Sequence, residues 1–289
     1  MSTTFRRVLN LLGTCLAVVG VAFVGWRLYQ YSAELSFSAM TGWHWIVIVL
    51  LSLLYGLSNV LLALTWWQLL GFFGFRCCPL QATRIYGMSQ LAKYVPGNIF
   101  QLAGRQALGM GQGMPAGPLA KSMLLELILI AVAGLLFGYL VLPVYLPVLS
   151  GIETVGLLLV TAAVLTMTLF RQWARSVAWG FLALMLFLGV SALVFVVLLE
   201  LLDGLTVSWL VVMGAFVLAW LAGFVTPGAP AGVGIRELVL LVLLEGQVQP
   251  GPLLLAVLLG RLVTVLGDVW FFLVALAIPT HQKGNLHDA

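Results

Sequence analysis

The sequence predicts an all-α polytopic membrane protein with about six full transmembrane helices and two re-entrant broken hairpins, arranged as an inverted repeat. The first observation is composition: 63% of the 289 residues are hydrophobic and 8% are charged, whereas soluble domains are about half apolar and about a quarter charged. The second is a series of apolar runs as long as a bilayer crossing. The third is a pair of Pro-Gly breaks. This composition excludes a soluble enzyme and a disordered chain.

Apolar runs define the full crossings. At about 20 residues per crossing, a chain of 289 residues holds roughly six to eight segments. The first run follows Arg6 and Arg7 and is longer than the core of a signal peptide, so we expect an uncleaved first span. The apolar runs are 8–29, 45–70, 118–142, 152–170, 177–199, 207–225 and 252–278.

Two less apolar segments, 80–110 and 207–246, are interrupted by Pro-Gly pairs and predict re-entrant hairpins. An offset of 131 residues superimposes Pro96-Gly97 on Pro227-Gly228 and also Arg105 on Arg236. The same offset moves the run 45–70 close to the run 177–199. We therefore expect a single membrane domain over 1–289, with one repeat at about 8–142 and a second at about 152–278.

Three full spans between the hairpins make them enter from opposite sides, which inverts the second repeat. The alternative is that 207–225 crosses fully, which removes the inversion and sends Lys283 outside. Lysine and arginine favour the cytoplasmic side, so we expect both termini there. The basic residues then on that side are Arg6, Arg7, Arg76, Arg84, Lys121, Arg171, Arg175 and Lys283. The opposite side holds Arg27, Glu34, Glu153, Glu200, Asp203 and Glu245.

Each Pro-Gly break is a candidate binding site for an anion. We expect a new helix to begin near Asn98 and another near Gly232, with unpaired N–H groups and a positive dipole end inside the membrane. Alternatively, each break is only a turn, with an arginine snorkelling to the interface. The expected substrate-binding residues are Lys93, Pro96, Gly97, Asn98, Gln101, Arg105, Pro227, Gly228, Arg236 and Glu237.

Some of these residues also have a structural interpretation. Lys93 could snorkel, Asn98 could cap a helix, and Glu237 could neutralise its neighbour Arg236. The same choice applies to three ionisable residues within the apolar runs, Glu126, Arg261 and Asp268. A charge at mid-bilayer costs about 3 kcal/mol on insertion scales, so such residues form ion pairs or serve function.

Arg261 and Asp268 are seven residues apart and so share one helix face. Glu126 could pair with Arg261 or Arg236, or these acidic residues could couple transport to protons. Cys15, Cys77 and Cys78 lack a metal-binding spacing, and no motif of a hydrolase, nucleotide-binding loop or metalloprotease occurs in the sequence. We therefore expect no catalysis, no metal and no cofactor.

Two motifs resemble a known family. Residues 93–98 read Lys-Tyr-Val-Pro-Gly-Asn, with Gly104-Arg105 following; this resembles the KYLPGN…GR signature of the flippase-like transmembrane domain of lysylphosphatidylglycerol synthases. Residues 226–237 resemble its second signature, P-G-G-x-G-x-R-E, with Ala-Pro-Ala at 229–231 in place of a tighter glycine run. Residues 122–126 and 260–262 are similar to the helices that follow the motifs, so the resemblance covers about 45–278.

The resemblance implies a multi-pass protein of the bacterial inner (cytoplasmic) membrane, without the soluble aminoacyl-transfer domain. The implied function is flipping of a lipid with an anionic or modified phosphate-bearing headgroup, by alternating access of the inverted halves. Its partners are then membrane lipids, either an anionic phospholipid or a polyprenyl phosphate. The alternative is a non-transporting membrane partner that presents a lipid or polyprenyl-linked substrate to a separate synthase or glycosyltransferase. A homo-oligomer, a lipid-modifying enzyme as partner and proton coupling stay open.

Overall fold

The computed structural model describes residues 41–95, 100–202, 207–226 and 234–279. Over these ranges it contains helices and no strand, so the protein is all-α, as predicted. The first helices are α2 (Gly42–Phe72), α3 (Pro79–Gln90), the 3-10 helix η2 (Leu91–Tyr94), α4 (Phe100–Gly111), α5 (Ala116–Leu136), the 3-10 helix η3 (Phe137–Val141) and α6 (Leu142–Tyr145). They are followed by α7 (Gly151–Gln172), α8 (Arg175–Leu201), α9 (Trp209–Val225), α10 (Ile235–Leu243) and α11 (Pro250–Ala277).

Within the described ranges, five helical segments are long and apolar enough to cross a membrane, and the chain is a polytopic membrane protein. They are Gly42–Phe72, Ala116–Tyr145, Gly151–Gln172, Arg175–Leu201 and Gly251–Ala277. Each of them overlaps one of the predicted full crossings. The predicted first crossing, 8–29, lies outside the described residues.

Local sequence explains where several of these helices begin. Pro79 occupies the first position of α3, where its missing N–H leaves no hydrogen bond unmade. At the start of α7, the Ser150 hydroxyl accepts the Glu153 N–H at 3.3 Å, and the Glu153 carboxylate accepts the Ser150 N–H at 2.6 Å. This reciprocal capping box satisfies two N–H groups at the start of α7 and so marks where the helix begins.

The two segments predicted as hairpins consist of shorter helices. α3 and α4 have 12 residues each and α10 has 9, so at about 1.5 Å per residue none of them reaches across a hydrocarbon core of about 30 Å. α9 has 17 residues, which is also shorter than the five spans. The Pro-Gly breaks themselves lie outside the described residues. The helices that follow begin at Phe100 and Ile235, close to the expected starts at Asn98 and Gly232.

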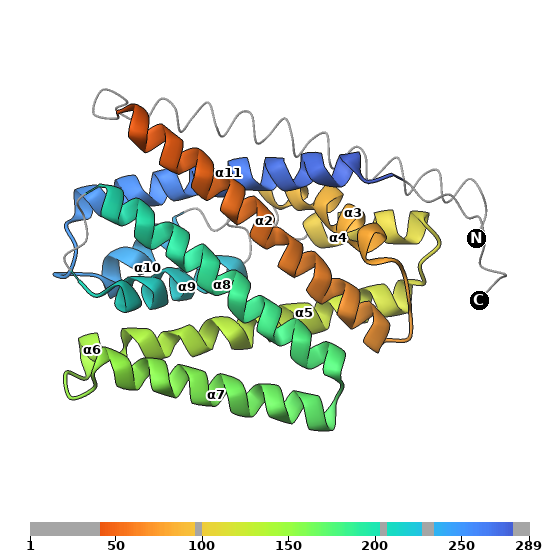
Figure 1. Ribbon diagram of the computed structural model, residues 1–289, viewed down its shortest axis with the longest axis horizontal. Helices are drawn as coiled ribbons and strands as arrows, with labels where there is room; N and C mark the ends of the chain where they lie inside the picture. The colour runs from red at the N-terminus through yellow and green to blue at the C-terminus, as the bar shows by residue number, and fades with distance from the viewer. Residues whose placement is uncertain (1–40, 96–99, 203–206, 227–233, 280–289) are drawn as a thin grey trace.

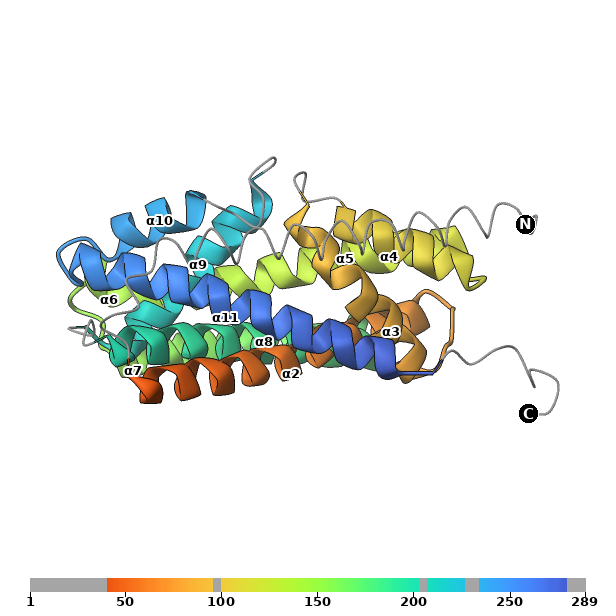
Figure 2. The ribbon, with the colours of Figure 1, turned by 90° about the horizontal axis from the view of Figure 1, so that it is seen from above.

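The order of elements in the first half recurs in the second. Shifted by 131 to 134 residues, α2, α3, α4 and α5 fall on α8, α9, α10 and α11. Corresponding long helices run in opposite directions along the long axis of the molecule (Figure 1): α2 opposes α8, and α5 opposes α11. Seen from above, α3 and α4 occupy one end of the molecule, and α9 and α10 occupy the other (Figure 2).

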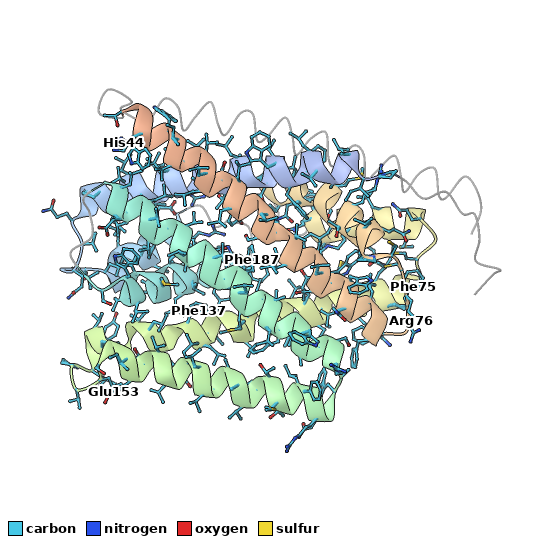
Figure 3. The ribbon with its side chains drawn as sticks, in the orientation of Figure 1. His44, Phe75, Arg76, Phe137, Glu153 and Phe187 are labelled. Carbon is cyan, nitrogen blue, oxygen red and sulfur yellow. The ribbon has the colours of Figure 1, made fainter. Side chains whose placement is uncertain are left out.

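The two ends of the molecule differ in charge. Arg76 lies at the end where α2 finishes, and Glu153 lies at the opposite end (Figure 3). Arg171 and Arg175 flank the α7–α8 turn, at the same end as Arg76.

Arg84 donates a hydrogen bond to the carbonyl of Ile278, which attaches α3 to the last turn of α11.

Helices α2 and α11 cross in direct backbone contact. A Cβ atom on Gly56 would lie 2.8 Å from the Gly267 carbonyl oxygen, and one on Gly267 would lie 2.7 Å from the Ser52 carbonyl oxygen. Small residues permit this kind of close approach between membrane helices. Because Gly267 precedes Asp268, the crossing places the Asp268 carboxylate between the two helices, where it is fully buried.

We predict that Gly267→Ala lowers the thermal unfolding midpoint of the purified protein in detergent. The added methyl group overlaps the backbone of α2, and overpacking of this kind costs about 1–3 kcal/mol. Gly156→Ala is the matched control, because a Cβ atom there would meet nothing within 4 Å. Equal unfolding midpoints for the two variants would contradict the backbone contact.

Candidate functional site

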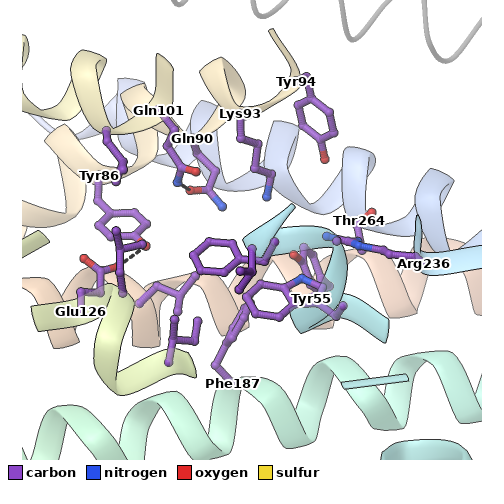
Figure 4. Close-up of a pocket in the computed structure, with 18 of the residues that line it drawn as sticks. Tyr55, Tyr86, Gln90, Lys93, Tyr94, Gln101, Glu126, Phe187, Arg236 and Thr264 are labelled. Carbon is purple, nitrogen blue, oxygen red and sulfur yellow. Dashed lines mark hydrogen bonds between the residues drawn. The ribbon is translucent and has the colours of Figure 1, made fainter. Parts of the chain in front are cut away.

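A cavity of about 430 Å³ lies between the two sets of short helices. Its wall combines polar side chains with apolar ones, and Figure 4 shows the polar groups directed toward its interior. Six of the residues predicted from the sequence line it: Lys93, Gln101, Arg105, Glu126, Arg236 and Arg261. Other lining residues were not predicted as site residues from the sequence, although Tyr94 belongs to the 93–98 motif; among them are Tyr55, Tyr86, Gln90, Tyr94, Trp220 and Thr264.

Asp268, which is buried behind the cavity wall, accepts hydrogen bonds from three other elements. Its Oδ1 atom accepts from Asn59 of α2 at 3.1 Å and from Gln90 of α3 at 3.2 Å. Its Oδ2 atom lies 2.7 Å from the Lys93 ammonium and also accepts the Tyr94 hydroxyl, both from η2. This Asp268 cluster binds α3 and η2 to α11 and α2.

Lys93 differs from the other members of the Asp268 cluster in its exposure. Its side chain is 23% exposed, whereas that of Asp268 is 0% exposed. The Lys93 side chain points into the cavity (Figure 4). A hydrogen bond of 2.8 Å from Gln101 of α4 to Gln90 extends the network to the helix after the first break. The polar face of the first segment is therefore ordered by direct contacts.

A second buried pair lies at the other end of the cavity. The Arg105 guanidinium is 2.5 Å from the Glu126 carboxylate, and both side chains are nearly inaccessible. Glu126 also accepts the Tyr86 hydroxyl at 2.7 Å. The Arg105 guanidinium carbon lies 3.8 Å from the centre of the Tyr86 ring and 5.4 Å from that of Trp66. Arg105 is thus neutralised and enclosed by aromatic faces.

A third pair connects α10 with α11. The Nε and Nη2 atoms of Arg261 donate to Glu237 Oε1 at 2.9 and 2.5 Å. Glu237 Oε2 accepts the Gly234 N–H at 2.8 Å, at the start of α10. Glu237 therefore pairs with Arg261 and not with its neighbour Arg236. It also uses one of the α10 N–H groups that were expected to bind an anion.

Arg236 is the remaining cation of the cavity. It is half-buried, and its guanidinium carbon lies 5.8 Å from the centre of the Trp220 ring. It is close enough to Lys93 and Tyr94 to interact with them electrostatically. Among the described residues it forms no ion pair, and its buried Nε has no hydrogen-bond partner. Arg236 therefore offers donors and a positive charge to the cavity.

The ion pairs of the two halves correspond in position but not in polarity. In the first half an arginine of the short helix, Arg105, pairs with a glutamate of the following long helix, Glu126. In the second half the short helix supplies the acid, Glu237, and the long helix supplies the base, Arg261. The counterpart of Arg105 at an offset of 131 is Arg236. The reversed polarity of the second pair therefore leaves this arginine without a carboxylate within the described ranges.

The other residues predicted from the sequence do not line the cavity or lie outside the described residues. Glu237 and Asp268 do not line the cavity but form ion pairs with residues that do. Glu126 pairs with Arg105, and the expected pairing with Arg261 or Arg236 is wrong. The predicted residues outside the described ranges are Pro96, Gly97, Asn98, Pro227 and Gly228.

Some of the missed residues had a signal in the sequence. Tyr86, Gln90 and Tyr94 follow one another at intervals of four and so mark one helix face. Tyr55 and Asn59 have the same spacing inside an apolar run. Other lining residues, such as Trp220, had no local signal because only tertiary packing brings them to the cavity.

The described residues offer no group of three or more His, Cys, Asp or Glu side chains that could bind a metal ion. Cys77 and Cys78 are free thiols in the connection between α2 and α3. Burial, followed by the neighbouring Cys78, raises the pKa of the Cys77 thiol to about 11. This thiol is therefore protonated at neutral pH and a poor nucleophile.

We predict that Arg105→Met destabilises the protein more than the double substitution Arg105→Met/Glu126→Leu. The single change leaves the buried Glu126 carboxylate without its cation, which costs about 3–5 kcal/mol, whereas the double change removes both charges. Thermal unfolding in detergent measures both effects, with the exposed Arg171→Met as control. A double variant as unstable as the single one would show that the ion pair is not the source of the loss.

Comparison of the sequence with protein-family models gives no match, and comparison with curated proteins gives none either. These two comparisons therefore assign the chain to no family.

Proposed function

We propose that the protein moves a lipid with an anionic, phosphate-bearing headgroup between the leaflets of a membrane. The observation that carries this proposal is Arg236, a cation of the cavity that has no carboxylate partner among the described residues. The other three cations that line the cavity, Lys93, Arg105 and Arg261, each lie within 2.7 Å of an acidic side chain. A bound anion supplies the charge that Arg236 lacks.

The chemistry of Arg236 supports a phosphate as the bound group. An isolated charge inside a membrane protein is costly and marks a substrate pathway more often than a structural contact. A guanidinium presents several N–H donors in a plane, which matches the oxygens of a phosphate in a bidentate contact. The nearby amides and hydroxyls, such as Gln101 and Tyr94, can orient the headgroup.

The surroundings of the cavity support a lipid rather than a soluble anion. Its wall includes Leu127, Ile130, Phe187 and Val265, and it lies inside a bundle of membrane-spanning helices. Its volume falls in the range of sites for small molecules, about 300–1,000 Å³. This volume suits a headgroup bound inside the protein while the acyl or prenyl chains stay in the bilayer.

The arrangement of the two halves supports movement of the lipid. We propose that the halves form an inverted repeat, which the opposed directions of α2 against α8 and of α5 against α11 support. Binding sites of transporters with inverted repeats lie between the halves, near broken helices, and rocking of the halves exposes the site to each side in turn. We also propose a bacterial inner membrane with cytoplasmic termini; the separation of Arg76 from Glu153 along the molecule supports an orientation with the Arg76 end on the cytoplasmic side.

We predict that Arg236→Ala abolishes movement of fluorescent phosphatidylglycerol in proteoliposomes, measured by quenching of the outer-leaflet label with an impermeant reductant. The substitution removes the cation available to the phosphate and disturbs no ion pair of the described residues. Arg171→Ala, at the exposed end of α7, is the matched control and should move the lipid as the unaltered protein does. Normal movement by Arg236→Ala would refute the assignment of the site.

The same experiment separates transport from lipid presentation. Specific binding of phosphatidylglycerol by the unaltered protein, without movement across the bilayer, would favour a membrane partner that presents a lipid to a separate enzyme. Arg236→Ala should then lower binding while leaving the transbilayer distribution unchanged.

A further inference from the structure

We infer that the cavity selects lipids whose headgroup carries a single negative charge, that is, phosphodiesters rather than phosphomonoesters. This inference rests on the proposed function and narrows its class of substrate. It follows from the balance of charges around the cavity, and therefore depends on the three ion pairs as well as on Arg236.

The described cavity and its pairing residues carry one surplus positive charge. The cations that line the cavity are Lys93, Arg105, Arg236 and Arg261. The carboxylates within ion-pair distance of them are Glu126, Glu237 and Asp268. Neither of the two breaks, 96–99 and 227–233, contains an ionisable side chain. The surplus of one positive charge therefore resides on Arg236.

A phosphodiester matches this surplus, since it carries one negative charge at neutral pH. A phosphomonoester carries about −1.5 to −2 at pH 7, so its binding leaves negative charge uncompensated in the cavity. Net charge is penalised there because few water molecules can screen it within a membrane-spanning bundle. The diester is thus the ligand that leaves the occupied cavity neutral.

The paired cations are poorly placed to compensate a second negative charge. Moving Lys93 onto the ligand would leave Asp268 fully buried with neutral donors alone. Moving Arg105 would leave Glu126, 6% exposed, with the Tyr86 hydroxyl. Stranding a buried charge in this way is strongly destabilising. In the third pair the more exposed member is the acid: the Glu237 side chain is 23% exposed and that of Arg261 is 8% exposed.

The test compares two lipids that differ by one methyl group on the phosphate. Phosphatidic acid is a monoester, and phosphatidylmethanol, its methyl ester, is a diester of charge −1. Each competes with fluorescent phosphatidylglycerol for the purified protein reconstituted in phosphatidylcholine vesicles at pH 8. We expect phosphatidylmethanol to compete on the order of tenfold better than phosphatidic acid, the effect of one uncompensated charge at a partly screened site.

A second measurement changes the net charge around the cavity and leaves the charge of the ligand as it is. Glu237→Gln keeps the side-chain shape and removes one negative charge, so the surplus of positive charge around the cavity rises from one to two. We expect this variant to lose the preference for the diester and to bind phosphatidic acid at least as well as phosphatidylmethanol. Glu245→Gln is the matched control, because Glu245 is exposed in the turn after α10 and should leave the preference unchanged.

The outcomes distinguish this inference from the proposed function. Competition by both lipids to the same extent, or an unchanged preference in folded Glu237→Gln, overturns the charge selection while leaving lipid transport standing. Failure of every anionic lipid to compete or move overturns the proposed function itself. If Glu237→Gln does not fold, the competition of the two lipids for the unaltered protein still decides the inference.

Discussion

The ion pair between Lys93 and Asp268 is the interaction on which the first half of the site depends. Asp268 lies on α11 and is fully buried, so its charge requires several donors at once. Asn59, Gln90, Lys93 and Tyr94 supply these donors from α2, α3 and η2. A helix of 12 residues cannot span the membrane by itself, and the shared carboxylate fixes its end against two helices that do.

The charged groups around the cavity, apart from Arg236, are paired with one another, although Arg105 Nε, like Arg236 Nε, has no hydrogen-bond partner among the described residues. Aromatic rings enclose Arg105, and Glu126 neutralises it, while Glu237 both caps α10 and binds Arg261. Such networks are favourable in a medium of low polarity only when every member has partners. Because the other charges are paired, Arg236 is the cation that most affects which charge a ligand of the cavity can carry. The selectivity proposed above then follows from the sum of the charges around the cavity and not from one contact.

The spans could be predicted because an apolar run of about 20 residues is a strong local signal. The helix starts at Phe100 and Ile235 were also predictable to within a few residues, since the preceding Pro-Gly pairs interrupt any helix. Which charges pair could not be predicted. The partner of Glu126 depends on how far α4 is rotated against α5, and Lys93 meets Asp268 only through the packing of η2 on α11. These are tertiary contacts between residues that no spacing relates.

The crossing of α2 and α11 has a mechanical consequence. Gly56 lies in the first half of the chain and Gly267 in the second, and a Cβ atom on Gly267 would meet the backbone of Ser52 and Gly56 as well as the Tyr55 ring. Side chains at an interface can change rotamer as two helices slide, but backbones in contact have no such freedom. If the two halves rock against one another as proposed, the glycine crossing is their fulcrum, and displacements increase from it toward both ends of α2 and α11.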